Sequence, residues 1–68
     1  MEIKYFPDTD TAHIEFSKKE IVNTKEISQN VYIDFDNLGN IVSMTIEHAN
    51  SNANIKEFSF KEMKAHIG

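Results

Sequence analysis

The sequence contains no cysteine and no arginine among its 68 residues. Without cysteine, the chain has no disulfide, no thiolate metal ligand and no cysteine nucleophile. This absence fits the reducing environment of the cytoplasm, where we expect the protein to act. No apolar run approaches the roughly 20 residues that a membrane-spanning helix needs, so we expect no membrane partner.

The missing arginine bears on nucleic-acid binding, because arginine clamps phosphate and guanine with two parallel hydrogen bonds. All seven basic residues are lysines, and eleven acidic residues bring the net charge to −4. Contacts with phosphate supply most of the affinity of a protein for nucleic acid. We therefore expect no autonomous binding of DNA or RNA.

The length predicts a single small domain that spans residues 1–68. A chain of this size buries only about 60% of the surface that its unfolded form exposes, so its core is marginal. Such chains are usually stabilised by disulfides, by a metal ion or by association with a second copy. Since disulfides are excluded, we expect a homo-oligomer, most simply a dimer.

Apolar and polar residues alternate with a period of two over much of residues 1–48, which predicts half-buried strands. The runs on either side of "PDTD" predict one hairpin. Those on either side of "DNLGN" predict another, with Gly39 supplying the positive φ of a bulged turn. Residues 21–27 have no clear apolar side, which favours an edge strand. We expect an α+β fold with a small antiparallel sheet of four to five strands, one face apolar and the other polar.

The pattern changes after the last strand. The stretch "HANSNAN" carries three asparagines and no apolar side chain larger than alanine, so residues 49–57 are predicted to form a loop. Ser59 and Glu62 have the spacing of a capping box, which predicts a short C-terminal helix over about residues 60–67. We expect this helix to pack on the apolar face of the sheet without covering it fully.

A metal-binding or metal-dependent site on the polar sheet face is the alternative hypothesis. One imidazole and three carboxylates are expected there, enough to bind Zn²⁺, Mn²⁺ or Mg²⁺ if they converge. These residues are His13, Glu15, Asp34 and Glu47. Their spacing matches no recognised ligand motif, and solvated sheet faces are normally built from such side chains, so we expect no metal and no cofactor. The neighbouring Asp8 and Asp10 are explained as turn formers.

The sequence shows no recognisable catalytic set. The candidate general bases are His13, His48 and His66, and no serine or threonine nucleophile lies beside them in a known arrangement. A small core also leaves little room to enclose a substrate. We therefore expect a non-catalytic protein-interaction module rather than an enzyme.

Several large apolar side chains are candidates for a protein interface. Phe6 and Tyr32 fall on the expected polar face, where exposed rings without nearby arginine favour contact with another protein. The interface candidates are Phe6, Tyr32, Phe58, Phe60 and Met63.

Four motifs occur in an order that resembles a known family. They are "YFPDTDTAHIEFS", "TKEIS", "VYIDFDNLGNIV" and "MTIEHAN", which together cover about the first fifty residues. This order resembles the bacterial and archaeal domain of unknown function 2283 family, with departures at Phe6, Thr11 and His48. The resemblance implies a small β-rich fold with a C-terminal helix and no established activity.

The resemblance also suggests a partner. Small proteins of this kind are sometimes encoded beside RelE-like ribonuclease toxins, which suggests an antitoxin-like inhibitor of a basic protein. The acidic charge of the chain is compatible with this role, because carboxylates can cover the basic active site of an RNA-cleaving enzyme.

Overall fold

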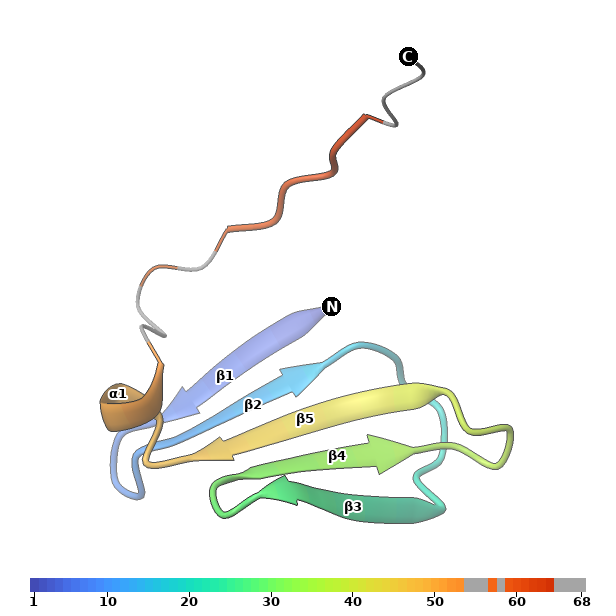
Figure 1. The fold of residues 1–68 in the computed structure, drawn as a ribbon, viewed down its shortest axis with the longest axis horizontal. Helices are drawn as coiled ribbons and strands as arrows, with labels where there is room; N and C mark the ends of the chain where they lie inside the picture. The colour runs from blue at the N-terminus through green and yellow to red at the C-terminus, as the bar shows by residue number, and fades with distance from the viewer. Residues whose placement is uncertain (54–56, 58, 65–68) are drawn as a thin grey trace.

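The computed structural model describes residues 1–53, 57 and 59–64. Five antiparallel strands form one sheet with the spatial order β1-β2-β5-β4-β3 (Figure 1). One short helix, α1, follows the last strand. The elements are β1 (Glu2–Phe6), β2 (Thr11–Glu15), β3 (Asn23–Ser28), β4 (Val31–Phe35), β5 (Ile41–Glu47) and α1 (Ala49–Asn52). The predicted α+β fold, with its antiparallel sheet of four to five strands, is confirmed.

Both predicted hairpins form, and they meet in the middle of the sheet. β1 pairs with β2, β4 pairs with β5, and β2 pairs with β5 to join the two hairpins. β3 lies at the edge as predicted, and every one of its residues is exposed. Gly39 has a φ of 84°, and the register shifts between Asp34 and Phe35, which confirms the bulged hairpin.

A buried aspartate closes the turn between β4 and β5. The side chain of Asp36 accepts hydrogen bonds from the backbone N–H groups of Leu38, at 2.9 Å, and Asn40, at 2.8 Å. The residue is only 5% exposed. A carboxylate that satisfies two backbone donors fixes the chain path through the turn.

The helix of the structure is not in the predicted place. Residues 60–64 of the predicted helix have no helical structure, and residues 65–67 lie outside the described residues. α1 instead occupies part of the predicted loop, of which residues 54–56 lie outside the described part. An isolated helix shorter than about 12 residues is marginal in water whatever its cap, because packing supplies most helical stability.

Tertiary contacts explain why α1 forms where it does. The backbone N–H of Ala49 donates to the carbonyl of Asp10 at 2.9 Å, and Asn50 N–H donates to the Asp10 side chain at 3.0 Å. Ala49 is fully buried. His48 enters the helix with a φ of 53°, in the left-handed region, which turns the chain sharply at the end of β5.

The sheet is a single layer in the described structure. Figure 1 places α1 at one end of the sheet, near the turn between β1 and β2, to which it is hydrogen-bonded at Asp10. Among the described residues, no helix has the length and apolar character needed to cross a membrane.

Candidate functional site

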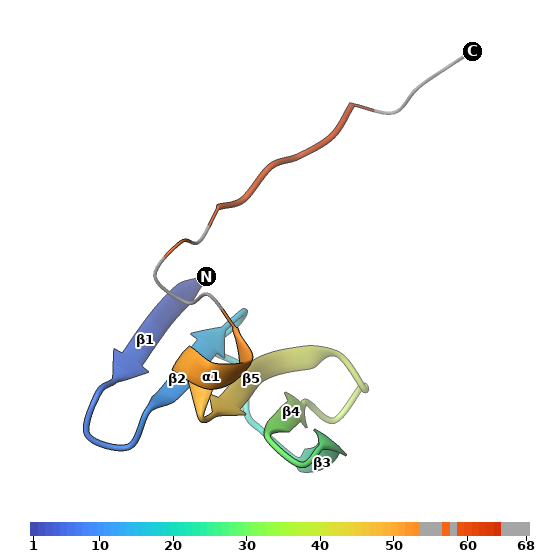
Figure 2. The same ribbon diagram turned by 60° about the vertical axis from the view of Figure 1, so that its left-hand side comes forward.

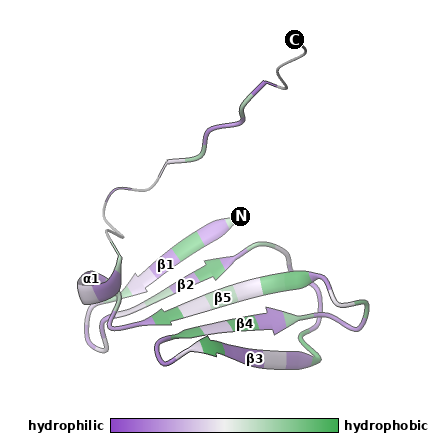
Figure 3. Ribbon diagram, in the orientation of Figure 1, coloured by the Kyte–Doolittle hydropathy of each residue, from purple (hydrophilic) through white to green (hydrophobic). Residues whose placement is uncertain are grey.

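The strand register divides the sheet into two chemically different faces. Apolar and polar residues alternate along the strands, as the colouring of Figure 3 shows. Cross-strand partners place the apolar residues on the same side of neighbouring strands. We define the apolar face as Ile3, Tyr5, Ala12, Ile14, Val31, Ile33, Phe35, Met44 and Ile46.

The apolar face is not buried by the described part of the chain. Ala12 is its one buried member, and the other eight remain partly exposed. The buried hydrophobic residues among the described ones are Ala12, Val42 and Ala49, none larger than valine. A sheet with one apolar face normally packs against a second layer, and this sheet has none among the described residues.

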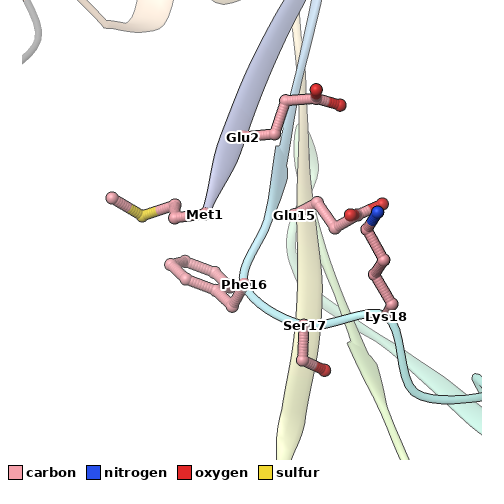
Figure 4. A pocket seen from close by; sticks show the side chains of 6 residues that line it. All are labelled: Met1, Glu2, Glu15, Phe16, Ser17 and Lys18. Atoms are coloured by element: carbon pink, nitrogen blue, oxygen red, sulfur yellow. The ribbon is translucent and has the colours of Figure 1, made fainter.

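Apolar surface extends beyond the face at one end of the sheet. An open hollow of about 360 Å³ lies there, lined by Met1, Glu2, Glu15, Phe16, Ser17 and Lys18. Figure 4 shows the side chains of Met1 and Phe16 on one side of the strands and those of Glu2, Glu15 and Lys18 on the other. Met1 is 64% exposed and Phe16 is 42% exposed, so these two side chains add apolar surface at this end, and the open hollow is not an enclosed substrate pocket.

The polar face has an excess of negative charge. Cross-strand partners place one lysine, Lys4, and five carboxylates on this side. The carboxylates are Glu2, Glu15, Glu26, Asp34 and Glu47. Lys4 forms an ion pair with Glu2 at 3.3 Å, which leaves most of the acidic charge open to a partner.

The four metal candidates lie on the polar face, but the register does not bring them together. Glu15 and Asp34 both lie opposite Ser43, so β5 separates them. Strands two places apart are about 10 Å from each other, too far for both carboxylates to bind one ion directly. In the described part of the chain, no group of three or more histidine, cysteine, aspartate or glutamate side chains is placed to hold a metal ion.

Hydroxyl groups bind two of these four candidates. Asp34 accepts hydrogen bonds from Thr24 on β3, at 2.6 Å, and from Ser43 on β5, at 2.5 Å. Each bond uses a different carboxylate oxygen, so Asp34 on β4 links its own strand to both β3 and β5. This arrangement gives Asp34 a structural role that the alternation of the sequence did not indicate.

His13 also has a partner that the sequence did not indicate. Its Nδ1 lies 3.1 Å from Oγ1 of Thr45, the cross-strand neighbour on β5. A threonine beside a histidine has the chemistry of a nucleophile and a base, but catalysis also needs a group that orients the ring and a site that stabilises an oxyanion. No carboxylate bonds the His13 ring within the described residues. The pair is explained as a cross-strand hydrogen bond.

The predicted interface candidates divide into two sets. Tyr32 and Phe6 lie on the polar face, where Tyr32 is partly exposed and Phe6 is 48% exposed. The negative charges of Glu47 and then Glu26 raise the pKa of Tyr32, which indicates the strength of the acidic surroundings. Phe60 and Met63 are exposed in the C-terminal segment, and Phe58 lies outside the described residues.

Residues 2–50 match the family described as protein of unknown function DUF2283. The match covers all five strands and the start of α1, in agreement with the resemblance seen in the motifs. No curated protein and no solved structure matches the chain. The match spans well over half of the sequence, and the chain therefore belongs to the DUF2283 family.

Proposed function

We propose that the protein is a non-catalytic interaction module that self-associates into a homodimer through its apolar face. The observation that carries this proposal is that eight of the nine residues of this face are still partly exposed in a single chain. Apolar surface removed from water contributes about 25 cal/mol per Å². A second copy is the simplest partner, because identical apolar surfaces related by a two-fold axis can bury each other.

A matched pair of variants on β4 tests this proposal. Ile33 and Tyr32 are neighbours on one strand and lie on opposite faces of the sheet. Ile33→Lys places a charge in the proposed interface, so we expect the dimer dissociation constant to rise at least about tenfold. Tyr32→Lys changes the polar face and is expected to leave the dimer intact. Sedimentation equilibrium gives both results, and a folded Ile33→Lys variant with unchanged dimer affinity would contradict the proposal.

The melting temperature of the unmodified protein provides a second test that needs no variant. A dimer that forms only from folded chains melts at a temperature that rises with protein concentration. This dependence reports self-association of the unmodified protein, so the test does not require Ile33→Lys to fold. A melting temperature that is the same over a wide concentration range would count against self-association.

A second function follows from the charge of the other face. If the apolar faces meet, the polar faces of both copies point outward, each with five carboxylates and one lysine. We propose that this surface binds a basic protein in the cytoplasm, in the manner of an antitoxin that covers the active site of a ribonuclease toxin. Opposite charges across such an interface speed encounter and select the partner.

Neutralising variants test the binding of a basic partner. The probe is the purified product of the gene next to this one, with affinity measured by calorimetry at low and high salt. Glu26→Gln with Glu47→Gln removes two charges from the polar face and is expected to weaken binding. Glu20→Gln with Glu57→Gln removes two charges outside the sheet strands and is the matched control. Equal effects of the two pairs, or no binding at low salt, would contradict this function.

A further inference from the structure

Two large apolar side chains near the C-terminus lie in water in the described structure. Phe60 is 77% exposed and Met63 is 73% exposed. Figures 1 and 2 both show residues 59–64 running away from the sheet, starting from the end at which α1 lies. None of the hydrogen bonds among the described residues joins this segment to the sheet. The same chain thus presents an uncovered apolar face and an apolar segment directed away from it.

We infer that residues 59–64 of each copy, here called the C-terminal arm, lie on the apolar face of the other copy. This inference rests on the proposed self-association and specifies what covers the face. The arm leads away from its own sheet in both views, so a second chain is the occupant that the geometry favours. A two-fold dimer with exchanged arms covers both faces at once.

The sequence of the arm suits an apolar surface. Phe60 and Met63 are three positions apart, so they share one side if the arm forms a helix. Ser59 and Glu62 have the spacing of a capping box at the start of such a helix. The arm is not helical in the described structure, where its apolar side is uncovered. Binding to a second sheet supplies the packing that a short helix lacks, so the helix forms on association.

Buried area also favours a contribution from the arms. Each partner in a standard interface contributes about 800 Å² of accessible surface. A phenylalanine alone buries about 150–250 Å², so Phe60 and Met63 of each arm supply a substantial share of such an interface.

Variants of the full chain separate the two proposals. Phe60→Ser with Met63→Ser removes the apolar side chains of the arm, and Lys61→Ser with Lys64→Ser is the matched control in the same segment. We expect the first pair to raise the dimer dissociation constant at least about tenfold and the second to raise it less. Circular dichroism checks that the sheet is retained, which is expected because Phe60 and Met63 are exposed in the single chain.

The outcomes for the two proposals are distinct. A monomeric full chain contradicts both self-association and arm exchange. A dimer that Ile33→Lys weakens, but that Phe60→Ser with Met63→Ser leaves unchanged, contradicts arm exchange alone and indicates direct contact between the sheets.

A spin label identifies which sheet the arm contacts. The chain has no cysteine, so Lys61→Cys gives a single attachment site on the arm. This labelled copy is mixed with a ¹⁵N-labelled copy that carries no spin label, so only contacts between copies broaden the observed signals. We expect broadening at apolar-face residues of β4 and β5. Broadening seen only when the spin label and ¹⁵N are in the same chain would show that the arm folds back on its own sheet, and would overturn the inference.

Discussion

The hydroxyl group of Tyr5 donates a hydrogen bond to Oδ1 of Asp10 over 2.7 Å. The same oxygen accepts the backbone N–H of Asn50 at 3.0 Å, and the side-chain amide of Asn50 donates to the Tyr5 hydroxyl at 2.8 Å. Asp10 adopts a φ of 54°, a left-handed conformation that aspartate tolerates better than most residues. These three residues join β1, the first turn and α1, so the second aspartate of the opening turn does more than form that turn.

Removing either partner of this bond is expected to loosen α1. Tyr5→Phe keeps the aromatic ring but loses the donor, and Asp10→Ala loses the acceptor shared by Tyr5 and Asn50. We expect Asp10→Ala to lower the melting temperature by several degrees and Tyr5→Phe to lower it less. Each variant loses two hydrogen bonds, but Asp10→Ala also removes the acceptor of a backbone N–H, that of Asn50, and places alanine at a φ of 54°. Asp8→Ala, in the same turn, is the control and should have little effect. Thermal unfolding followed by circular dichroism gives the comparison, and equal effects of Asp8→Ala and Asp10→Ala would contradict it.

Acid is expected to destabilise the protein through the turn between β4 and β5. Hydrogen bonds from the backbone N–H groups of Asn40 and Leu38 hold the pKa of Asp36 below its ordinary value. A carboxylate with a lowered folded-state pKa contributes stability that is present above its unfolded pKa and is lost as the pH falls through the folded value. The free energy of unfolding should therefore decrease below about pH 4.

The variant Asp36→Asn tests the source of this acid sensitivity. Asparagine retains an oxygen that accepts the two backbone bonds but does not titrate, so the loss of stability between pH 5 and pH 3 should become smaller. Urea unfolding at the two pH values measures the difference, with Asp8→Asn as the control for loss of one exposed carboxylate. If both variants keep the full pH dependence of the unmodified protein, Asp36 is not its source.

Glycine at position 39 is required by backbone conformation rather than by space. Its φ of 84° is one that residues with a Cβ rarely adopt, and nothing lies within 4 Å of the position that a Cβ would occupy. We expect Gly39→Ala to lower the free energy of unfolding by about 1 kcal/mol. Gly39→Asn should cost less, because asparagine tolerates the left-handed region. A Gly39→Ala variant as stable as the unmodified protein would contradict this explanation.

Metal ions are not expected to stabilise the protein. The polar face presents His13, Glu15, Asp34 and Glu47 at separate register positions, and hydroxyl groups bind both oxygens of Asp34. Binding of an ion to the folded state alone would raise the melting temperature. We therefore predict no rise with millimolar Zn²⁺ or Mn²⁺. A rise that His13→Ala abolishes would restore the alternative hypothesis of a metal site.

Sequence alternation predicted the part of the fold that depends on local chemistry. A period of two identified the strands and their two faces, and Gly39 identified the bulged hairpin, because these features follow from neighbouring residues. The position of α1 could not be predicted in this way. It depends on Asp10, which is 40 positions away from Asn50 in the sequence. The capping box at Ser59 is a local signal, and local signals do not form a short helix without packing.

The polar face shows the same difference between features set by neighbouring residues and features set by residues far apart in the sequence. The sequence placed His13 and Asp34 on the polar face, but their bonds to Thr45, Thr24 and Ser43 depend on strand register. Register is set by how the two hairpins meet, which no single segment encodes.

Sedimentation equilibrium of the unmodified 68-residue chain over a range of concentrations tests the central proposal most directly. Because the apolar face is uncovered in one copy, we predict a mass that approaches twice the 7.8 kDa of a single chain as concentration rises. A folded protein that keeps a mass of 7.8 kDa at every concentration would contradict the proposal.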